Sequence, residues 1–146
     1  MAVPANRSVP SSTVIPELVY DDVEAAVEWL CRAFGFSVRW QAGDHRAQLH
    51  VGDGAVVVRD RPPDVEQGAP VPGACSSVLV RVEDVDARHA AALGCGARVV
   101  REPCDHPYGE RQVTFEDLAG HRWTFTQSIA DVAPEEWGGV SVDISR

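Results

Sequence analysis

The sequence contains no lysine, because all 13 basic residues of the 146-residue chain are arginine. Without a lysine amine, the chain can form no Schiff base with a substrate or with pyridoxal phosphate, and it has no P-loop lysine for nucleotide phosphates. No apolar run approaches the about 18 residues that a membrane-spanning helix needs. We therefore expect neither of these chemistries and no membrane segment.

Positive charge is scarce as well, since the formal net charge is −9. A polyanion such as DNA is repelled by such a field, and the arginines are dispersed rather than clustered, so we expect no nucleic-acid partner. Residues 1–12 lack the basic-then-apolar order of a secretion signal. We expect them to form a flexible arm, and we expect the protein to be cytoplasmic.

The sequence also lacks the usual motifs of metal and nucleophile sites. Its four cysteines, Cys31, Cys75, Cys95 and Cys104, form no CxxC pair and no zinc-ribbon spacing, so we expect reduced thiols. There is no G-x-S-x-G elbow, no G-x-G-x-x-G after a strand and no H-E-x-x-H. The residues identify no catalytic group, and we expect no cofactor.

What the sequence does contain is one pattern that occurs twice. The two copies open with "VIPELVYDDVEAAVEWLCRAFGFSVRW" and "SVLVRVEDVDARHAAALGCGARVV". Each copy starts as an apolar strand, turns at an acidic pair followed by valine, and continues as a helix that glycine closes. The candidate caps are Asp21 or Asp22 and Glu83 or Asp84 at the helix starts, and Gly35 and Gly94 or Gly96 at the ends.

Three strand-like runs follow each helix, which gives the plan βαβββ twice and an α+β fold. The runs are 36–41, 46–51 and 55–60 in the first half, and 97–102, 110–117 and 121–127 in the second. We expect an arm (1–12), a first module (13–60), a linker (61–75), a second module (76–128) and a tail (129–146). Because each module alone is too small for a stable core, 13–128 should form one structural domain.

This order of elements, with the closing segment "YGERQVTFEDLAGHRWTFTQ", resembles the vicinal oxygen chelate superfamily from Thr13 to Ser128. That superfamily includes glyoxalases, bleomycin-resistance proteins and extradiol dioxygenases, and the glyoxalase-like or PhnB-like subgroup is the most similar. The resemblance implies a curved eight-stranded mixed sheet around a cup, with helices on its outer face. It also implies a homodimer, with cups formed within one chain or across two.

Many members of that superfamily are metalloenzymes, and the resemblance implies four ligand positions. They hold Ile15, Val57, Ser77 and Thr124, of which none is a histidine or a carboxylate. A register shift would bring in Glu17 or Gln127, yet three converging N or O ligands still do not assemble. We therefore expect no metal site.

Strand alternation predicts which side chains face the cup. His121 shares its face with Trp123 and Phe125, so we expect a core-edge histidine bonded to backbone rather than a ligand. His50 shares a face with Gln48, and that face is either solvent or cup.

Two further assignments stay open on the sequence alone. Glu17 and Arg81 could pair with each other or hold a polar ligand. Trp40 fits a core position and a ligand wall equally well, because it shares parity with Phe36 and Val38.

The sequence thus favours a metal-independent small-molecule-binding protein that sequesters an antibiotic or another hydrophobic metabolite. The alternative is a metal-dependent glyoxalase-like lyase or a dioxygenase-like enzyme. The candidate ligand-binding residues share a predicted inner face or a loop at its edge: Glu17, Trp40, His50, Ser77, Arg81, Tyr108 and Thr124.

Overall fold

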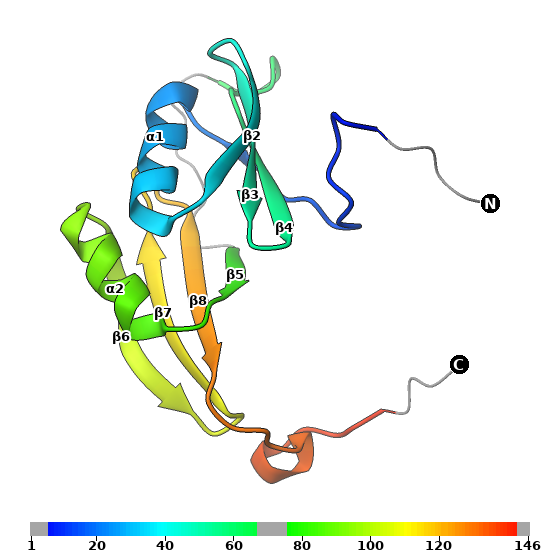
Figure 1. Ribbon diagram of the computed structural model, residues 1–146, viewed down its shortest axis with the longest axis vertical. Coiled ribbons are helices and arrows are strands. Elements are labelled where there is room, and N and C mark those ends of the chain that lie inside the picture. The colour runs from blue at the N-terminus through cyan, green and yellow to red at the C-terminus, as the bar shows by residue number, and fades with distance from the viewer. Residues whose placement is uncertain (1–5, 67–75, 143–146) are drawn as a thin grey trace.

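The structure is a computed structural model that describes residues 6–66 and 76–142, and it contains the βαβββ plan twice (Figure 1). The first module consists of β1 (Glu17–Val19), α1 (Val23–Phe34), β2 (Ser37–Ala42), β3 (Arg46–Val51) and β4 (Gly54–Arg59). The second consists of β5 (Ser77–Arg81), α2 (Val85–Gly94), β6 (Arg98–His106), β7 (Glu110–Glu116) and β8 (Arg122–Ser128). A 3₁₀ helix, η1 (Pro134–Trp137), follows in the tail.

The strands form two four-stranded mixed sheets with the same topology, β1-β4-β3-β2 and β5-β8-β7-β6. In each sheet the first strand of the module runs parallel to the last, and the other neighbours are antiparallel. The two predicted modules and the α+β class are confirmed. Within the described residues, the eight strands are not joined into the single hydrogen-bonded sheet that the sequence suggested.

The second acid of each acidic pair caps the helix. Asp22 Oδ1 accepts a hydrogen bond from the Ala25 amide, and Asp84 Oδ1 accepts one from the Ala87 amide, both at 3.0 Å. Gly35 ends α1 in the left-handed conformation with φ 76°. Neither helix, nor any other helix in the described ranges, is long and apolar enough to cross a membrane.

The two modules share one hydrophobic core, and Phe34 at the end of α1 lies in the middle of it. Its ring centroid is 4.9–6.0 Å from those of Phe115, Trp123 and Phe125, which belong to β7 and β8 of the other module. All four side chains are buried. The domain boundaries drawn from the sequence stay a prediction, since residues 67–75 of the linker lie outside the described residues.

Strand β6 extends four residues further than the predicted run, from Glu102 to His106. It passes through Pro103, which lacks a backbone N–H. The strand tolerates this residue because β6 is an edge strand and its pairing register shifts between Arg101 and Cys104.

Candidate ligand-binding site

Each sheet packs one face on the shared core and turns the other away from it. The strand pairing places side chains on the outward face of the first sheet, here the first open face: Glu17, Trp40, Arg46, Gln48, His50, Val57 and Arg59. The same argument defines the second open face: Ser77, Leu79, Arg81, Gln112, Thr114, Arg122, Thr124 and Thr126. All six predicted strand candidates therefore lie on open faces.

A β-bulge in β2 shapes the first open face. Val38 pairs with Leu49 and Trp40 pairs with Gln48, so that Arg39 is the extra residue. The bulge turns Trp40 to the face of Gln48, and strict alternation, which grouped Trp40 with Val38, fails at this point. Arg39 reaches the same face, because its Nη1 donates a hydrogen bond to Gln48 Oε1.

Residues 6–13 cross the first open face. They comprise the described part of the predicted arm and Thr13, and they are called the arm from here on. The carbonyl of Ser8 accepts hydrogen bonds from Trp40 Nε1 at 3.2 Å and from Gln48 Nε2 at 3.3 Å. These two bonds hold the arm against the sheet on the side opposite the core.

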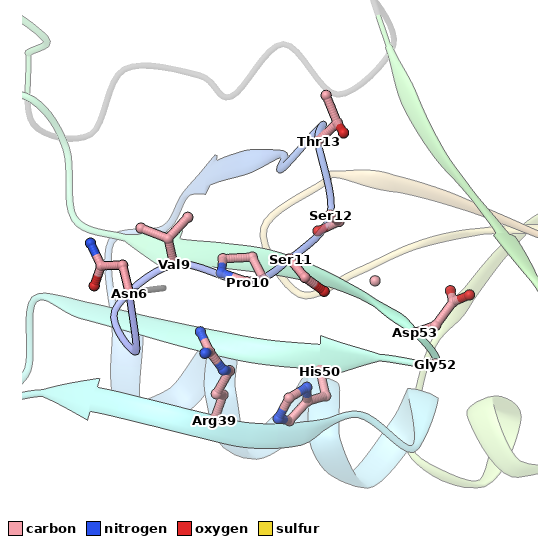
Figure 2. A pocket seen from close by; sticks show the side chains of 11 residues that line it. Asn6, Val9, Pro10, Ser11, Ser12, Thr13, Arg39, His50, Gly52 and Asp53 are labelled. Atoms are coloured by element: carbon pink, nitrogen blue, oxygen red, sulfur yellow. The ribbon is translucent and has the colours of Figure 1, made fainter. Parts of the chain in front are cut away.

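A cavity of about 1060 Å³ lies between the arm and the sheet. Arg39, His50 and the turn 52–54 line it from the sheet, and Asn6 and residues 9–13 line it from the arm. Figure 2 shows the side chains of Arg39 and His50 below the arm and Asp53 at the far end of the cavity. Of the seven candidate residues, only His50 lines this cavity.

Glu17 does not line this cavity, and it does not pair with Arg81. Its Oε1 accepts a hydrogen bond from Arg46 Nη2 at 2.5 Å, on the first open face but outside the cavity lining. The side chains of both residues are at least one-third exposed, so this is an ion pair at the surface.

The candidates on the second open face are spread over separate places. Ser77 lines a hollow of about 390 Å³ with His121 and Arg122, where β1 meets β5. Arg81 lines a groove of about 420 Å³ between the end of α1 and the start of α2. Thr124 Oγ1 lies 2.8 Å from Thr114 Oγ1. The structure does not bring these residues together around one ligand within a single chain.

Tyr108 lies in the turn between β6 and β7 and packs under the tail. Its ring stacks on His106 with centroids 5.0 Å apart, and the edge of Trp137 approaches it at 5.7 Å. The Tyr108 hydroxyl donates to Gln112 Oε1 at 3.2 Å. Partial burial, followed by the charge of Glu110, raises the pKa of Tyr108.

His121 occupies the structural position predicted for it. Its Nε2 lies 2.8 Å from the carbonyl oxygen of Val19, so Nε2 bears the proton and donates it. Its ring packs beside Tyr20 at 4.8 Å between centroids. The prediction of a core-edge histidine bonded to backbone is confirmed.

The positions where the resemblance implies metal ligands do not fit a divalent metal. Two are apolar, Ile15 and Val57, and two offer only a hydroxyl, Ser77 and Thr124. The shifted alternatives are engaged elsewhere. Glu17 pairs with Arg46, and Gln127 Oε1 accepts from the Val85 amide at 2.9 Å. Across residues 6–66 and 76–142, no three His, Cys, Asp or Glu side chains group as a metal site requires.

Sequence reasoning missed Arg39 and the arm residues of the cavity. No motif marks Arg39, which reaches the open face only because of the bulge. The arm was expected to be flexible, and its prolines and serines gave no sign that they would form a cavity wall.

Comparison with known proteins identifies relatives of the same architecture. A family model for the Glyoxalase/Bleomycin resistance protein/Dioxygenase superfamily matches residues 13–125. The crystal structure of TioX from Micromonospora sp. ML1 is 34% identical, covers 84% of this chain and 100% of that chain, and has a TM-score of 0.66.

Two further relatives extend the comparison. TnmS3, an antibiotic binding protein from Streptomyces sp. CB03234, is 26% identical over 88% of this chain and 98% of that chain, with a TM-score of 0.64. An uncharacterized protein of Mycobacterium bovis is 29% identical in an alignment 131 residues long that covers 83% of this chain and 86% of the relative.

Proposed function

The chain belongs to the Glyoxalase/Bleomycin resistance protein/Dioxygenase superfamily, and on that premise we propose that it is a metal-independent small-molecule-binding protein that sequesters an antibiotic or another hydrophobic metabolite. The observation on which the proposal rests is the cavity of about 1060 Å³ between the arm and the first open face. Cavities that bury drug-sized ligands have volumes of about 300–1,000 Å³, so this one has room for such a molecule.

The lining of the cavity supports a binding role. Val9 and Pro10 supply apolar surface, while Arg39 and His50 supply a small number of polar anchors. Sequestration by such walls needs no nucleophile. The similarity to TnmS3, an antibiotic binding protein, supports the choice of ligand class.

We also propose a homodimer, in which the second open face meets a partner copy. Leu79, on the edge strand β5 of that face, is 60% exposed in the single chain. A partner would bury this side chain and bring Ser77, Arg81, Tyr108 and Thr124 to the edge of a shared cup. Light scattering of the purified chain tests the dimer, and a monomer at micromolar concentration would contradict it. The cytoplasmic location expected from the sequence stays a prediction, which cell fractionation tests.

Ligand binding is tested by thermal shift against hydrophobic natural products and antibiotics. A ligand that binds the native state at a concentration of about 100 Kd should stabilise it by about 2.7 kcal/mol. His50→Ala should reduce the shift. The matched control is His45→Ala, since His45 lies exposed in the β2–β3 turn outside the cavity.

Metal independence needs its own measurement. Metal analysis of protein purified without added metal, followed by titration with divalent ions, should show no tight stoichiometric site. This expectation follows from the side chains at positions 15, 57, 77 and 124. A bound transition metal whose removal abolished an activity would overturn the proposal in favour of the lyase or dioxygenase alternative.

A further inference from the structure

We propose that the cavity under the arm selects organic monoanions, namely small molecules with one carboxylate, phenolate or sulfonate, and binds the anionic group between Arg39 and His50. This inference rests on the proposed function, because it concerns the same cavity. Four features support it: the charge of Arg39, the buried Ser12 hydroxyl without a partner, the position of Asp53, and the contact of Gln48 with Arg39.

Arg39 brings to the cavity a positive charge that no carboxylate neutralises within the described part of the chain. Its guanidinium donates to the amide oxygen of Gln48, which is neutral. By contrast, Arg46 and Arg111 pair with carboxylates. A guanidinium has five N–H donors in a planar fork, and those not used by Gln48 suit an anionic oxygen pair.

One further donor in the lining is buried without a partner. The Ser12 hydroxyl oxygen is buried and makes no hydrogen bond to any residue that the structure describes. The exposed His50 ring lines the cavity as well (Figure 2). A buried polar group without a partner is costly, so a ligand oxygen that accepts from Ser12 would relieve a defect of the unliganded protein.

The surrounding charge explains why the ligand should have only one negative group. The chain has a net charge of −9, so an anion is attracted here only by a local cation. Asp53 lines the same cavity at the end away from Arg39 (Figure 2). A second negative group on the ligand would approach this carboxylate, which favours monoanions over dianions.

Gln48 acts as a positioning residue for Arg39. It is 2% exposed, and its amide joins two neighbours: Nε2 donates to the Ser8 carbonyl at 3.3 Å, while Oε1 accepts from Arg39. Because glutamine is neutral, it orients the guanidinium without cancelling its charge. Glutamate at this position would cancel it.

The test compares two fluorescent probes with the same aromatic skeleton on the full chain. One is 8-anilinonaphthalene-1-sulfonate, a monoanion, and the other is N-phenyl-1-naphthylamine, which lacks the sulfonate. The wild-type chain should bind the sulfonate more tightly than the amine. Arg39→Gln should weaken sulfonate binding by about tenfold, as expected for loss of a charge-assisted hydrogen bond. Asp53→Asn should strengthen it, and neither change should alter amine binding.

Two variants separate the site from general charge effects. Gln48→Glu should lose the preference for the sulfonate while Arg39 remains, and its Tm and circular dichroism verify that it folds. Arg101→Gln is the matched control, because it removes the same charge from β6 in the other module.

The outcomes distinguish a failure of monoanion selection from a failure of ligand binding. If Arg101→Gln weakens sulfonate binding as much as Arg39→Gln, or if both probes bind equally in all variants, monoanion selection is wrong while ligand binding stands. If neither probe binds, the proposed function fails together with this inference.

Discussion

The Tyr20 hydroxyl donates a buried 2.5 Å hydrogen bond to Asp117 Oδ2, across 97 positions of the sequence. Trp123 Nε1 donates to the same oxygen at 3.0 Å. The other oxygen, Oδ1, accepts from the backbone amides of Ala119 and His121, both at 3.0 Å. One buried carboxylate therefore fixes the β7–β8 turn and joins it to the end of β1 in the other module.

Tyr20→Phe removes the hydroxyl that joins the two modules through Asp117. A hydrogen bond to a charged group contributes about 1.5–3 kcal/mol, so we expect the free energy of unfolding to fall by that amount. Urea denaturation measures it. The matched control is Tyr108→Phe, whose hydroxyl meets the neutral amide of Gln112 near the surface and should contribute about 1 kcal/mol or less. Equal losses in both variants would contradict the importance of the Asp117 contact.

The same contact predicts a fall in stability at high pH. Burial, followed by the negative charge of Asp117, raises the pKa of Tyr20 well above its ordinary value. Above about pH 10 the unfolded chain therefore loses this proton while the folded chain keeps it. Stability is fully present below that pH and should fall by up to about 1.4 kcal/mol per unit above it. Because the pKa of the less buried Tyr108 is also raised, urea midpoints measured across this range should lose a larger part of this slope in Tyr20→Phe than in Tyr108→Phe.

Local sequence signals were sufficient for the helices and for the faces of the straight strands. An acidic pair before valine limited the caps to Asp21 or Asp22 and to Glu83 or Asp84, and the second acid of each pair is the cap. The end of α1 at Gly35 was predicted as well. Alternation placed His121 on the core side of β8, because that strand pairs in register along its whole length. These features depend on a few neighbouring residues, which is why the sequence alone could predict them.

The candidate site depends on features that no local pattern contains. The bulge at Arg39 shifts the register of β2 by one residue and changes which face Trp40 occupies. Glu17 on β1 pairs with Arg46 on β3 across the strand β4 that lies between them. Alternation within one strand predicts the face of a side chain but not this order of strands. The course of residues 6–13 is set by hydrogen bonds from Trp40 and Gln48, which are distant in sequence.

Gly109 in the β6–β7 turn should not tolerate a side chain. Its φ is 84°, and a Cβ there would lie 2.2 Å from the carbonyl oxygen of Ala130. Gly109→Ala should therefore destabilise the fold by at least about 2 kcal/mol, through backbone strain together with displacement of the tail. Gly120→Ala is the control, since φ is 90° there but nothing lies within 4 Å of a Cβ. Gly120→Ala should lower the free energy of unfolding by only about 1 kcal/mol, from backbone strain alone. Urea denaturation of both variants measures the difference.

His121→Ala tests the structural role of this histidine. The substitution removes the hydrogen bond to the Val19 carbonyl, and we expect a loss of about 1 kcal/mol in the free energy of unfolding. Binding of 8-anilinonaphthalene-1-sulfonate should stay within about twofold, because the cavity under the arm does not include His121. A loss of binding without a loss of stability would instead assign the ligand to the hollow beside Ser77.

Removal of residues 1–13 should open the cavity without unfolding the domain. The arm supplies one wall of the cavity, yet none of its residues belongs to the shared core. The shortened chain should keep a cooperative unfolding transition and lose only the two hydrogen bonds to Ser8, each contributing about 1 kcal/mol. Its affinity for the sulfonate probe should fall by about tenfold, because Arg39 would then face open solvent, where salt and water screen its charge. Unchanged affinity would show that the arm is no wall of the site, and higher affinity would show that it blocks the ligand.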